Sequence, residues 1–581
     1  MVTLLLPLIL AAAGAIVSLG WRAAAAALYL AASASMLALG LLGILGAPLA
    51  ETVAVKLAPW MPSWPLRLSC GWLASVFLVA SSLALMTSAL HLYKDDGAGR
   101  LTSIALGLGI AATHLLIIAR DVLSLLVAWE LLSFAVAIAV AGGGDRRSGM
   151  LYLIVMHAAS VPMIASIAYM MGLGAAWFDK LPPALYLPVA AALLAAYTTK
   201  AGLPPLGFWV PPVYSSTRGS TAGLLVASEI PPLLQASLIL HPGSPHAVLL
   251  VALYVQSLAG VALGFIGGLW SRHVRRILGY TTVEYWGFAW LLLTLYASTG
   301  LDLVLAGLAA LVVAHAAYKA GLLASAWDLA SSSPSGDLLD EAPGLCRSPS
   351  PACRAAAVAA SSSLPIPPLA ASIGELMLIY SLAVLARSYP PLPWIYAALL
   401  AAAIIAPLTG IAYTRVSSAL LGGEGEARPS IADYGVAAVL LASPVLAAAA
   451  AARITPGLLN WLTLYAVVAA GIAAASAANP PRTRTWLSGE LIHSTGLRPA
   501  AVGLAAPSPR LGVESVLYRL RFPRLREVTY APAYYWVSRR LAALSRAVMR
   551  IHNGKLHIYL ALLLAYMVLL FIIALWVVLY A

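Results

Sequence analysis

The feature that most constrains this chain of 581 residues is a series of apolar runs, each about 20 residues long, which recurs along the whole sequence. A run of that length crosses a bilayer as a helix, because a helix satisfies its own backbone polar groups. The runs are continuous and rich in Ala and Leu, which excludes the alternating pattern of a membrane β-barrel. Only 9% of the residues are charged, against about 25% in soluble domains. The sequence therefore predicts an all-α polytopic membrane protein.

These runs predict about 16 transmembrane helices. The first run lacks a basic n-region and an evident A-x-A cleavage site, so we expect it to remain as a helix rather than to be removed as a signal peptide. The predicted helices cover residues 2–20, 24–46, 71–93, 102–119, 121–141, 149–172, 185–205, 219–240, 247–269, 275–299, 303–327, 355–386, 392–420, 434–453, 458–477 and 557–580.

The Lys and Arg residues outside these runs are unequally distributed between the two sides of the membrane. Loops after odd-numbered helices hold 12 of them, and the stretch 478–556, which also follows an odd-numbered helix, holds 13 more. Loops after even-numbered helices hold six. Because positively charged loops stay in the cytoplasm, we expect the odd-numbered loops there, both termini outside, and a multi-pass location in the plasma membrane.

Two segments are too polar to lie in the membrane. Residues 329–354 form a Ser/Pro-rich loop that we place in the cytoplasm. Residues 478–556 end in YYWVSRRLAALSRAVMRIHN, which is either a basic amphipathic helix on the inner membrane surface or on a partner subunit, or a solvated connector. Cys346 and Cys353 lie in the first segment. The sequence allows two alternatives for them, a disulfide or two free thiols. With only Cys70 besides these and no CxxC pair, the cysteines argue against a haem or iron–sulfur centre in this chain.

Several ionisable side chains lie inside the apolar runs, where an ionised group costs at least ~2.5–3.5 kcal/mol. His315 and Lys319 are four residues apart and so share one helix face. A chain of buried acids and bases can pass protons, because protonating one group changes the proton affinity of the next. For any single residue, a structural ion pair or a snorkelling side chain is the alternative. The group comprises Glu130, Lys200, Glu229, Glu284, His315, Lys319 and Glu375, with His114 and His157 as further polar groups.

Two of the runs contain a Pro-Pro-Leu break close to an ionisable residue. The seventh run ends in Lys200 followed by AGLPPLGFW, and the twelfth contains LPIPPLAASIGE up to Glu375. Paired Pro-interrupted segments of this kind point to inverted repeats and a site near the middle of the membrane. We therefore expect broken helices at positions seven and twelve.

Five segments follow one another along the chain, namely RDVLSLLVAWELLS, TKAGLPPLGFWVPP, VRRILGYTTVEYWG, HAAYKAGLLAS and PPLAASIGELML. In this order they resemble segments of the antiporter-like, proton-conducting membrane subunits of respiratory complex I, Mrp-type antiporters and membrane-bound [NiFe] hydrogenases. The resemblance covers about residues 60–430 and the C-terminus. RDVLSLLVAWELLS places Glu130 on the family's essential glutamate, and TKAGLPPLGFWVPP places Lys200 on its central lysine. VRRILGYTTVEYWG is similar to the family's "LKR-x-LAYS-x-x-ENIG" and includes Arg275. HAAYKAGLLAS is similar to "NHALFKSLLF", which carries over His315 and Lys319, and PPLAASIGELML carries over the Glu375 position.

Several details favour the hydrogenase branch, namely hydrogenase-4 component B and the formate hydrogenlyase membrane subunit. Glu284 fits the glutamate of the ENIG segment, and LYLIVMHAAS with His157 resembles that branch's sixth helix. RTRTW at 482–486 resembles its Thr-Trp-x-Cys-Gly, with Ser488 in place of the cysteine, and RIHNGKLHIYLALLLAYMVLLF resembles its final helix.

Two departures from the family pattern concern the line of polar groups between Lys200 and His315. Pro231 stands where the eighth helix of the family carries a second lysine, with Glu229 two residues earlier. Gly207 stands where the seventh-helix motif has a histidine. Either Glu229 and water substitute for the missing groups, or this chain conducts poorly and serves as a scaffold.

The resemblance implies a domain order built on two inverted five-helix repeats. Residues 1–100 would hold helices 1–3, 101–240 the first repeat and 241–425 the second repeat with the loop 329–354. Residues 426–477 would hold helices 14 and 15, 478–556 the basic cytoplasmic segment and 557–581 the last helix.

The resemblance also implies a proton-translocating subunit of a complex I-like or group 4 hydrogenase-like respiratory complex. Glu130, Lys200, His315, Lys319 and Glu375 would carry the protons, with Glu229, Glu284, His157 and Arg275 as auxiliary residues. No cofactor is expected in this chain, and iron–sulfur and Ni-Fe centres would reside in partner subunits. The alternatives are an Mrp-like cation/proton antiporter and a conduction-impaired scaffold. Protons are favoured over sodium because no oxygen-rich cation cage is evident.

Overall fold

A computed structural model describes residues 2–454, with gaps at 48, 56–63, 144, 178–180, 182, 243–246, 333–336, 340–344, 346–350, 365–368, 390–391 and 422–429, together with 486–487 and 490–491. All of these residues belong to one compact unit, Met1–Phe522. Cys346, the predicted helices at 458–477 and 557–580, and the predicted amphipathic helix lie outside the described residues.

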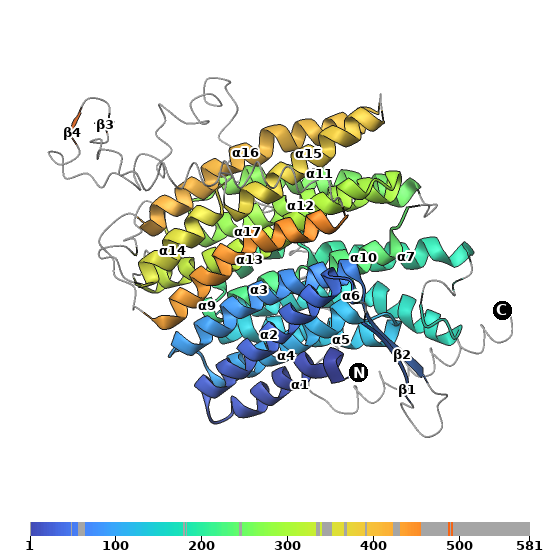
Figure 1. Ribbon diagram of the computed structural model, residues 1–581, viewed down its shortest axis with the longest axis horizontal. Coiled ribbons are helices and arrows are strands. Elements are labelled where there is room, and N and C mark those ends of the chain that lie inside the picture. The colour runs from blue at the N-terminus through green and yellow to red at the C-terminus, as the bar shows by residue number, and fades with distance from the viewer. Residues whose placement is uncertain are drawn as a thin grey trace, which may run out of the picture. The chain divides into compact units, whose positions relative to one another are not determined.

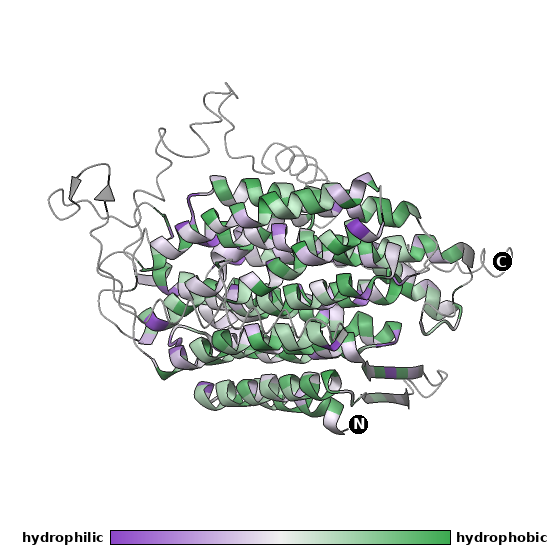
Figure 2. Cartoon of the chain, turned by 45° about the horizontal axis from the view of Figure 1, so that its top comes forward, coloured by the Kyte–Doolittle hydropathy of each residue, from purple (hydrophilic) through white to green (hydrophobic). Residues whose placement is uncertain are grey.

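The described part of the chain is a bundle of helices that run side by side (Figure 1), with hydrophobic residues along their length (Figure 2). Among the described residues, eleven helical spans are long and apolar enough to cross a membrane, and each overlaps a predicted span. The helices are α1 (Val2–Val17), α2 (Arg22–Ile44), α3 (Trp72–Lys94), α4 (Arg100–Ile118), α5 (Val122–Gly142), α6 (Arg146–Gly172), α7 (Pro183–Lys200), α8 (Val210–Ser216), α9 (Gly219–Ser228), α10 (Pro231–Ile239), α11 (Ala247–Trp270), α12 (Val274–Thr299), α13 (Asp302–Ser332), α14 (Pro351–Ser362), α15 (Ala370–Ser388), α16 (Pro393–Leu421) and α17 (Ile431–Ile454).

Helix α13 forms the centre of the bundle. Its most apolar stretch is completely buried, and it packs against α3, α9, α12, α15 and α17. A helix that is apolar on all sides is stable only in such a position. Since α13 carries His315 and Lys319, both side chains lie in the interior of the protein rather than in lipid.

Three helices are interrupted at prolines. Helix α7 ends at Lys200, and a turn and a 3₁₀ segment, Gly207–Trp209, lead into α8. The predicted twelfth helix is divided into α14 and α15. Both breaks were expected from the sequence. The predicted span 219–240 is confirmed as one apolar span, Gly219–Ile239, and it too is divided, into α9 and α10. Pro231 and Pro232 lack the backbone N–H groups that would continue α9.

A two-stranded hairpin adds a feature that the all-α prediction did not contain. Strand β1 (Leu49–Val55) pairs antiparallel with β2 (Trp64–Cys70), in a register from Leu49↔Cys70 to Val55↔Trp64. The Arg67 N–H donates to Asp121 Oδ2 at 2.9 Å, and the Arg120 N–H donates to the Arg67 carbonyl at 2.7 Å. These bonds attach the hairpin to the connection between α4 and α5. Two further residue pairs, β3 (Trp486–Leu487) and β4 (Glu490–Leu491), form a second short ladder.

Ion pairs join loops that follow odd-numbered predicted helices. Arg218 contacts Asp95 at 2.7 Å and Arg22 contacts Asp96 at 2.6 Å. Burial alone would raise the pKa of Asp95, but hydrogen bonds from Arg218 and Ser220 outweigh it and hold that pKa below its usual value. The basic loops that the charge count grouped together therefore meet at one end of the bundle.

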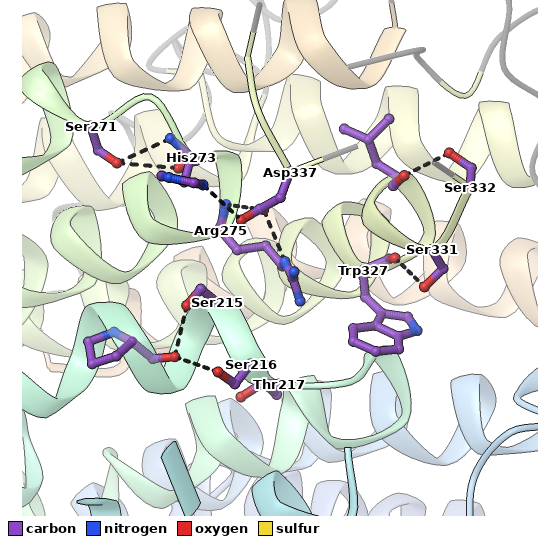
Figure 3. A network of polar contacts seen from close by, with 12 residues as sticks. Ser215, Ser216, Thr217, Ser271, His273, Arg275, Trp327, Ser331, Ser332 and Asp337 are labelled. Atoms are coloured by element: carbon purple, nitrogen blue, oxygen red, sulfur yellow. Dashed lines mark hydrogen bonds and ion pairs between the residues drawn. The ribbon is translucent and has the colours of Figure 1, made fainter. Parts of the chain in front are cut away.

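A second set of contacts at this end surrounds Trp327, near the end of α13 (Figure 3). The guanidinium groups of Arg218 and Arg275 lie 5.0 Å and 5.4 Å from the centre of the Trp327 ring. Arg275 also contacts Asp337 at 3.0 Å. These contacts tie the starts of α9 and α12 to the end of α13.

Candidate functional site

Lys200 occupies a fully buried pocket at the break after α7. Its Nζ donates to Ser133 Oγ at 2.6 Å and lies 4.2 Å from the centre of the Trp129 ring. The Tyr152 ring is 5.9 Å away. A hydroxyl and aromatic faces can hold a charged amine or release a neutral one, since none of them carries a formal charge. The pocket thus suits a lysine that changes its protonation state.

Glu130 lies on α5 but does not contact Lys200 in this structure. Its Oε2 lies 3.4 Å from His157 Nε2 on α6, and its side chain is 24% exposed. The other carboxylate oxygen, Oε1, is buried and has no hydrogen-bond partner among the described residues. Glu130 and Lys200 are therefore arranged as a separated pair, each with another partner.

Glu229 lies at the break between α9 and α10 and is fully buried. Its carboxylate accepts hydrogen bonds from the Tyr214 hydroxyl, at 3.0 and 3.2 Å, and from Trp286 Nε1 at 2.8 Å. The break between the two helices places this carboxylate in the core. Sequence reasoning identified Glu229 but not its two partners, which lie 15 and 57 residues away.

His315 is held between aromatic rings on α12 and α13. The Tyr285 ring stacks on the imidazole with centroids 3.9 Å apart, and the Trp286 ring lies 5.7 Å away in an edge contact. His315 Nδ1 lies 3.2 Å from the Tyr318 hydroxyl. Its Nε2 is buried and has no partner within the described structure. Trp286 thus contacts both Glu229 and His315.

Lys319 lies one residue after Tyr318 and is fully buried. Its Nζ donates to Thr281 Oγ1 at 2.8 Å, to the Tyr413 hydroxyl at 2.9 Å and to the Leu278 carbonyl at 3.2 Å. All three N–H donors of a protonated lysine are therefore satisfied by neutral acceptors. Within the described structure, Lys319 is held by these neutral groups and makes no ion pair with a carboxylate.

Glu284 and Glu375 line one small cavity of about 10 Å³, which is at the lower limit of the space that one water needs. Thr409 donates to Glu284 Oε1, while Glu284 Oε2 is buried without a partner among the described residues. Thr281 and Tyr413, the partners of Lys319, line the same cavity. A water here would face both carboxylates and the surroundings of Lys319.

The predicted residues therefore form two groups. The first group extends from Glu229 to Glu375. Its members are connected by contacts through Trp286, His315, Lys319 and the cavity. The Tyr152 ring lies 5.9 Å from Lys200 Nζ, and its buried hydroxyl has no hydrogen-bond partner among the described residues, so it does not join Lys200 to Glu229 by hydrogen bonds. Arg275, an auxiliary candidate, lies away from both groups and pairs with Asp337 at the helix ends.

Metal ligands and cysteines complete the description of the site. Among the described residues, no group of three or more His, Cys, Asp or Glu side chains could hold a metal ion. Cys353 is disulfide-bonded, so the alternative of a free thiol there was wrong, and Cys70 is free and buried.

The part of the chain that contains these residues is similar to a known protein family. Residues 119–389, which include Glu130, Lys200, Glu229, His315 and Glu375, match the family described as NADH:quinone oxidoreductase/Mrp antiporter, TM. NADH-quinone oxidoreductase subunit N 2 of Opitutus terrae is 27% identical over 203 residues, which is 32% of this chain and 42% of that protein. The subunit of the same name from Solidesulfovibrio magneticus is 24% identical over 396 residues, or 59% of this chain and 80% of that one. The chain spans less than half the length of the first curated relatives it matches.

Solved structures share the fold at low sequence identity. A chain of the membrane-bound sulfane sulfur reductase, an archaeal respiratory membrane complex, has a TM-score of 0.69 and 17% identity, over 98% of this chain and 100% of that chain. A chain of the Mrp complex from Dietzia has a TM-score of 0.63 and 17% identity, over 78% and 97%. A chain of respiratory complex I from Thermus thermophilus has a TM-score of 0.59 and 20% identity, over 79% and 98%.

Proposed function

We propose that this chain is a proton-translocating membrane subunit of a complex I-like or group 4 hydrogenase-like respiratory complex, because residues 119–389 match the NADH:quinone oxidoreductase/Mrp antiporter family. Partner subunits would carry the iron–sulfur and Ni-Fe centres and the electron transfer. This chain would move protons along its buried acids and bases. As part of the same proposal the chain lies in the plasma membrane with both termini outside, as the distribution of its Lys and Arg residues predicts.

The observation that carries the proposal is the line of buried ionisable groups from Glu229 to Glu375. An ionised side chain inside a membrane protein needs a partner or a function. Lys319 is satisfied by neutral groups alone, and Glu284 leaves one oxygen without a partner in the described structure. Groups held in this way can gain or lose a proton without breaking a strong ion pair.

In the proposed cycle a proton enters from the cytoplasm, loads the region of Lys200, His315 and Lys319, and leaves outward past Glu375. The separation of Glu130 from Lys200 supports a gate, because moving the carboxylate to the lysine would favour its charged form. Glu229 supports the view that a carboxylate replaces the missing lysine of the eighth helix, since it contacts Trp286 and, through it, His315.

The whole-length similarity to a subunit of an archaeal respiratory complex supports assembly with partners over action alone. An Mrp-like cation/proton antiporter remains the second candidate, and it is supported by the fold shared with the Mrp complex. The two differ in their energy source. A redox-driven subunit moves protons only when electrons flow, whereas an antiporter responds to a cation gradient.

The test uses the complex purified through a tag on this chain and reconstituted in proteoliposomes. Reduced methyl viologen supplies electrons, with protons, polysulfide or a quinone analogue as acceptors in separate runs, and a pH dye reports proton movement. We expect coupled proton movement that falls at least about tenfold in Lys200→Ala and Glu130→Gln, while electron transfer persists. Unchanged proton movement in both variants would support a scaffold, and movement driven by a sodium pulse without electrons would support the antiporter. His114→Gln is the control, because His114 is buried in α4 and, among the described residues, its hydrogen bond is to the Leu4 carbonyl at 2.7 Å.

A further inference from the structure

Two tyrosine hydroxyls lie between Lys319 and His315. The Tyr413 hydroxyl, on α16, accepts from Lys319 Nζ at 2.9 Å and lies 3.3 Å from the Tyr318 hydroxyl on α13. Tyr318 in turn lies 3.2 Å from His315 Nδ1. All four side chains are at most 2% exposed. Lys319 and His315 are thus joined by a continuous line of exchangeable hydrogens, inside a core closed to bulk water.

We propose that the hydroxyl groups of Tyr318 and Tyr413 relay protons between Lys319 and His315. The proposal rests on the proposed function and names two residues that carry out one step of it.

The donors and acceptors of this line can be arranged in one direction. A protonated Lys319 already donates to Thr281 and to the Leu278 carbonyl, and its third N–H points at Tyr413. Tyr413, having accepted from the lysine, is free to donate to Tyr318, which can then donate to Nδ1 of a neutral His315. Every donor in the line then has an acceptor.

The transfer balances without any other reactant. Lys319 gives a proton to Tyr413, Tyr413 gives its own to Tyr318, and Tyr318 gives its own to His315 Nδ1. One N–H and two O–H bonds break, and two O–H bonds and one N–H bond form. Lys319 becomes neutral, His315 becomes an imidazolium, and both tyrosines end as neutral phenols. The buried Nε2 of His315 is then the atom from which the proton leaves.

The rings around the relay hold it in position. The Tyr285 ring stacks on His315, and the Tyr285 hydroxyl is anchored to the Leu311 carbonyl at 2.7 Å. Tyr413 and Tyr318 meet edge to face, with ring centroids 5.8 Å apart. The Tyr318–Tyr413 and Tyr318–His315 contacts, at 3.3 and 3.2 Å, are about 0.4–0.6 Å longer than an optimal O–H hydrogen bond. The rings must therefore approach for transfer, and the relay is in an open state in this structure.

Tyr413 also connects this relay to the far end of the site. It lines the small cavity together with Glu284 and Glu375. A proton that reaches Lys319 therefore lies next to two routes, one through the tyrosines to His315 and one through the cavity to Glu375.

The test uses the reconstituted complex and the assay described above. Tyr318→Phe keeps the ring and leaves all three hydrogen bonds of Lys319 in place, so it removes only the relay hydroxyl. We expect at least about a tenfold loss of proton movement with electron transfer retained. Tyr413→Phe should give a similar loss. Tyr29→Phe is the control, since it removes an equally buried hydroxyl, bonded to the Ser103 carbonyl at 2.7 Å, far along the chain from the relay.

A second measurement separates a relay from a packing role. Infrared difference spectra of the complex, with and without electron flow, are recorded with ring-labelled tyrosine. We expect phenol bands that change with turnover and that disappear in Tyr318→Phe but persist in Tyr29→Phe. Wild-type proton movement in Tyr318→Phe, or the absence of any changing phenol band, would overturn the relay. If Lys319→Ala abolishes movement while Tyr318→Phe does not, only the relay fails; if the wild-type complex moves no protons, the proposed function fails with it.

Discussion

Trp286 donates a hydrogen bond from Nε1 to Glu229 at 2.8 Å, and the same indole ring lies 5.7 Å from His315. The indole thus fixes a carboxylate from the broken α9–α10 segment against the central helix α13. This contact joins Glu229 to His315 beside Pro231, the position at which the sequence resemblance places a lysine.

The first prediction concerns this carboxylate. Glu229→Gln keeps the shape of the side chain and can still accept from Tyr214 and Trp286, but it cannot carry a negative charge. We expect coupled proton movement to fall at least about tenfold with electron transfer preserved. The measurement is the ratio of protons moved to electrons transferred in proteoliposomes. A ratio equal to that of the wild type would mean that Glu229 is only a structural acceptor.

A second prediction concerns Ser133, whose hydroxyl accepts from Lys200 and donates to the Trp129 carbonyl at 2.8 Å. Hydrogen bonds to charged groups contribute about 1.5–3 kcal/mol. Removing the acceptor in Ser133→Ala should therefore slow proton movement by about tenfold or more, because the buried ammonium loses its bond. Ser133→Thr keeps a hydroxyl that can make both bonds and should retain most of the activity. Equal rates in the two variants would contradict this role of Ser133.

The sequence located most of the ionisable residues but few of their partners. Apolar runs define the spans, and an acid or base within a run is visible without any knowledge of the fold. Ser133, Trp286 and Tyr413 were missed, because they contact Lys200, Glu229 and Lys319 across 57–94 residues of chain. No local pattern distinguishes a serine or tyrosine that binds a lysine from one that packs in a helix. The only signal for Tyr318 was its position beside Lys319.

The breaks in the helices were likewise predicted only in part. The Pro-Pro-Leu segments predicted the interruptions after Lys200 and before Ala370, whereas Pro231 was read only as a missing lysine. The same loss of N–H donors ends α9 there. The hairpin of β1 and β2 was missed because it follows from pairing between two short segments, which helical periodicity does not detect.

The third prediction concerns the close packing of α11 on α12. A Cβ added at Gly264 would lie 2.6 Å from the Tyr280 carbonyl oxygen and 2.7 Å from Glu284 Cα. Gly264→Ala must therefore push the helices apart and move Glu284, at a cost of about 1–3 kcal/mol. We expect a lower melting temperature of the purified complex and weaker proton movement. Gly172→Ala is the control, because a Cβ there meets nothing within 4 Å. Equal melting temperatures for the two variants would show that α11 and α12 can separate without cost.

The last prediction concerns Asp337, which binds the start of α12. Its Oδ1 accepts from the backbone N–H of Arg275 at 3.1 Å and from Arg275 Nε at 3.0 Å, and its Oδ2 lies 3.5 Å from His273. Burial alone would raise the pKa of Asp337, but the His273 hydrogen bond and the Arg275 charge outweigh it and lower that pKa below 3.8. A lowered pKa in the folded state stabilises the contact above the unfolded value, about 3.9. The stabilisation is lost as the pH falls through the folded value.

The lowered pKa of Asp337 determines how hydrogen exchange at the start of α12 should depend on pH. At pH 6, Asp337→Asn should speed exchange of the Arg275 amide severalfold, after correction for the intrinsic rate, because the charged acceptor is gone. Near pH 2–3 the wild type should approach the variant, since its own carboxylate is then protonated. Asp145→Asn is the matched control, because Asp145 accepts from the amides of Arg147 and Ser148 and should loosen α6 instead. A wild-type to variant difference that persists unchanged to pH 2 would mean that the charge of Asp337 does not hold this helix end.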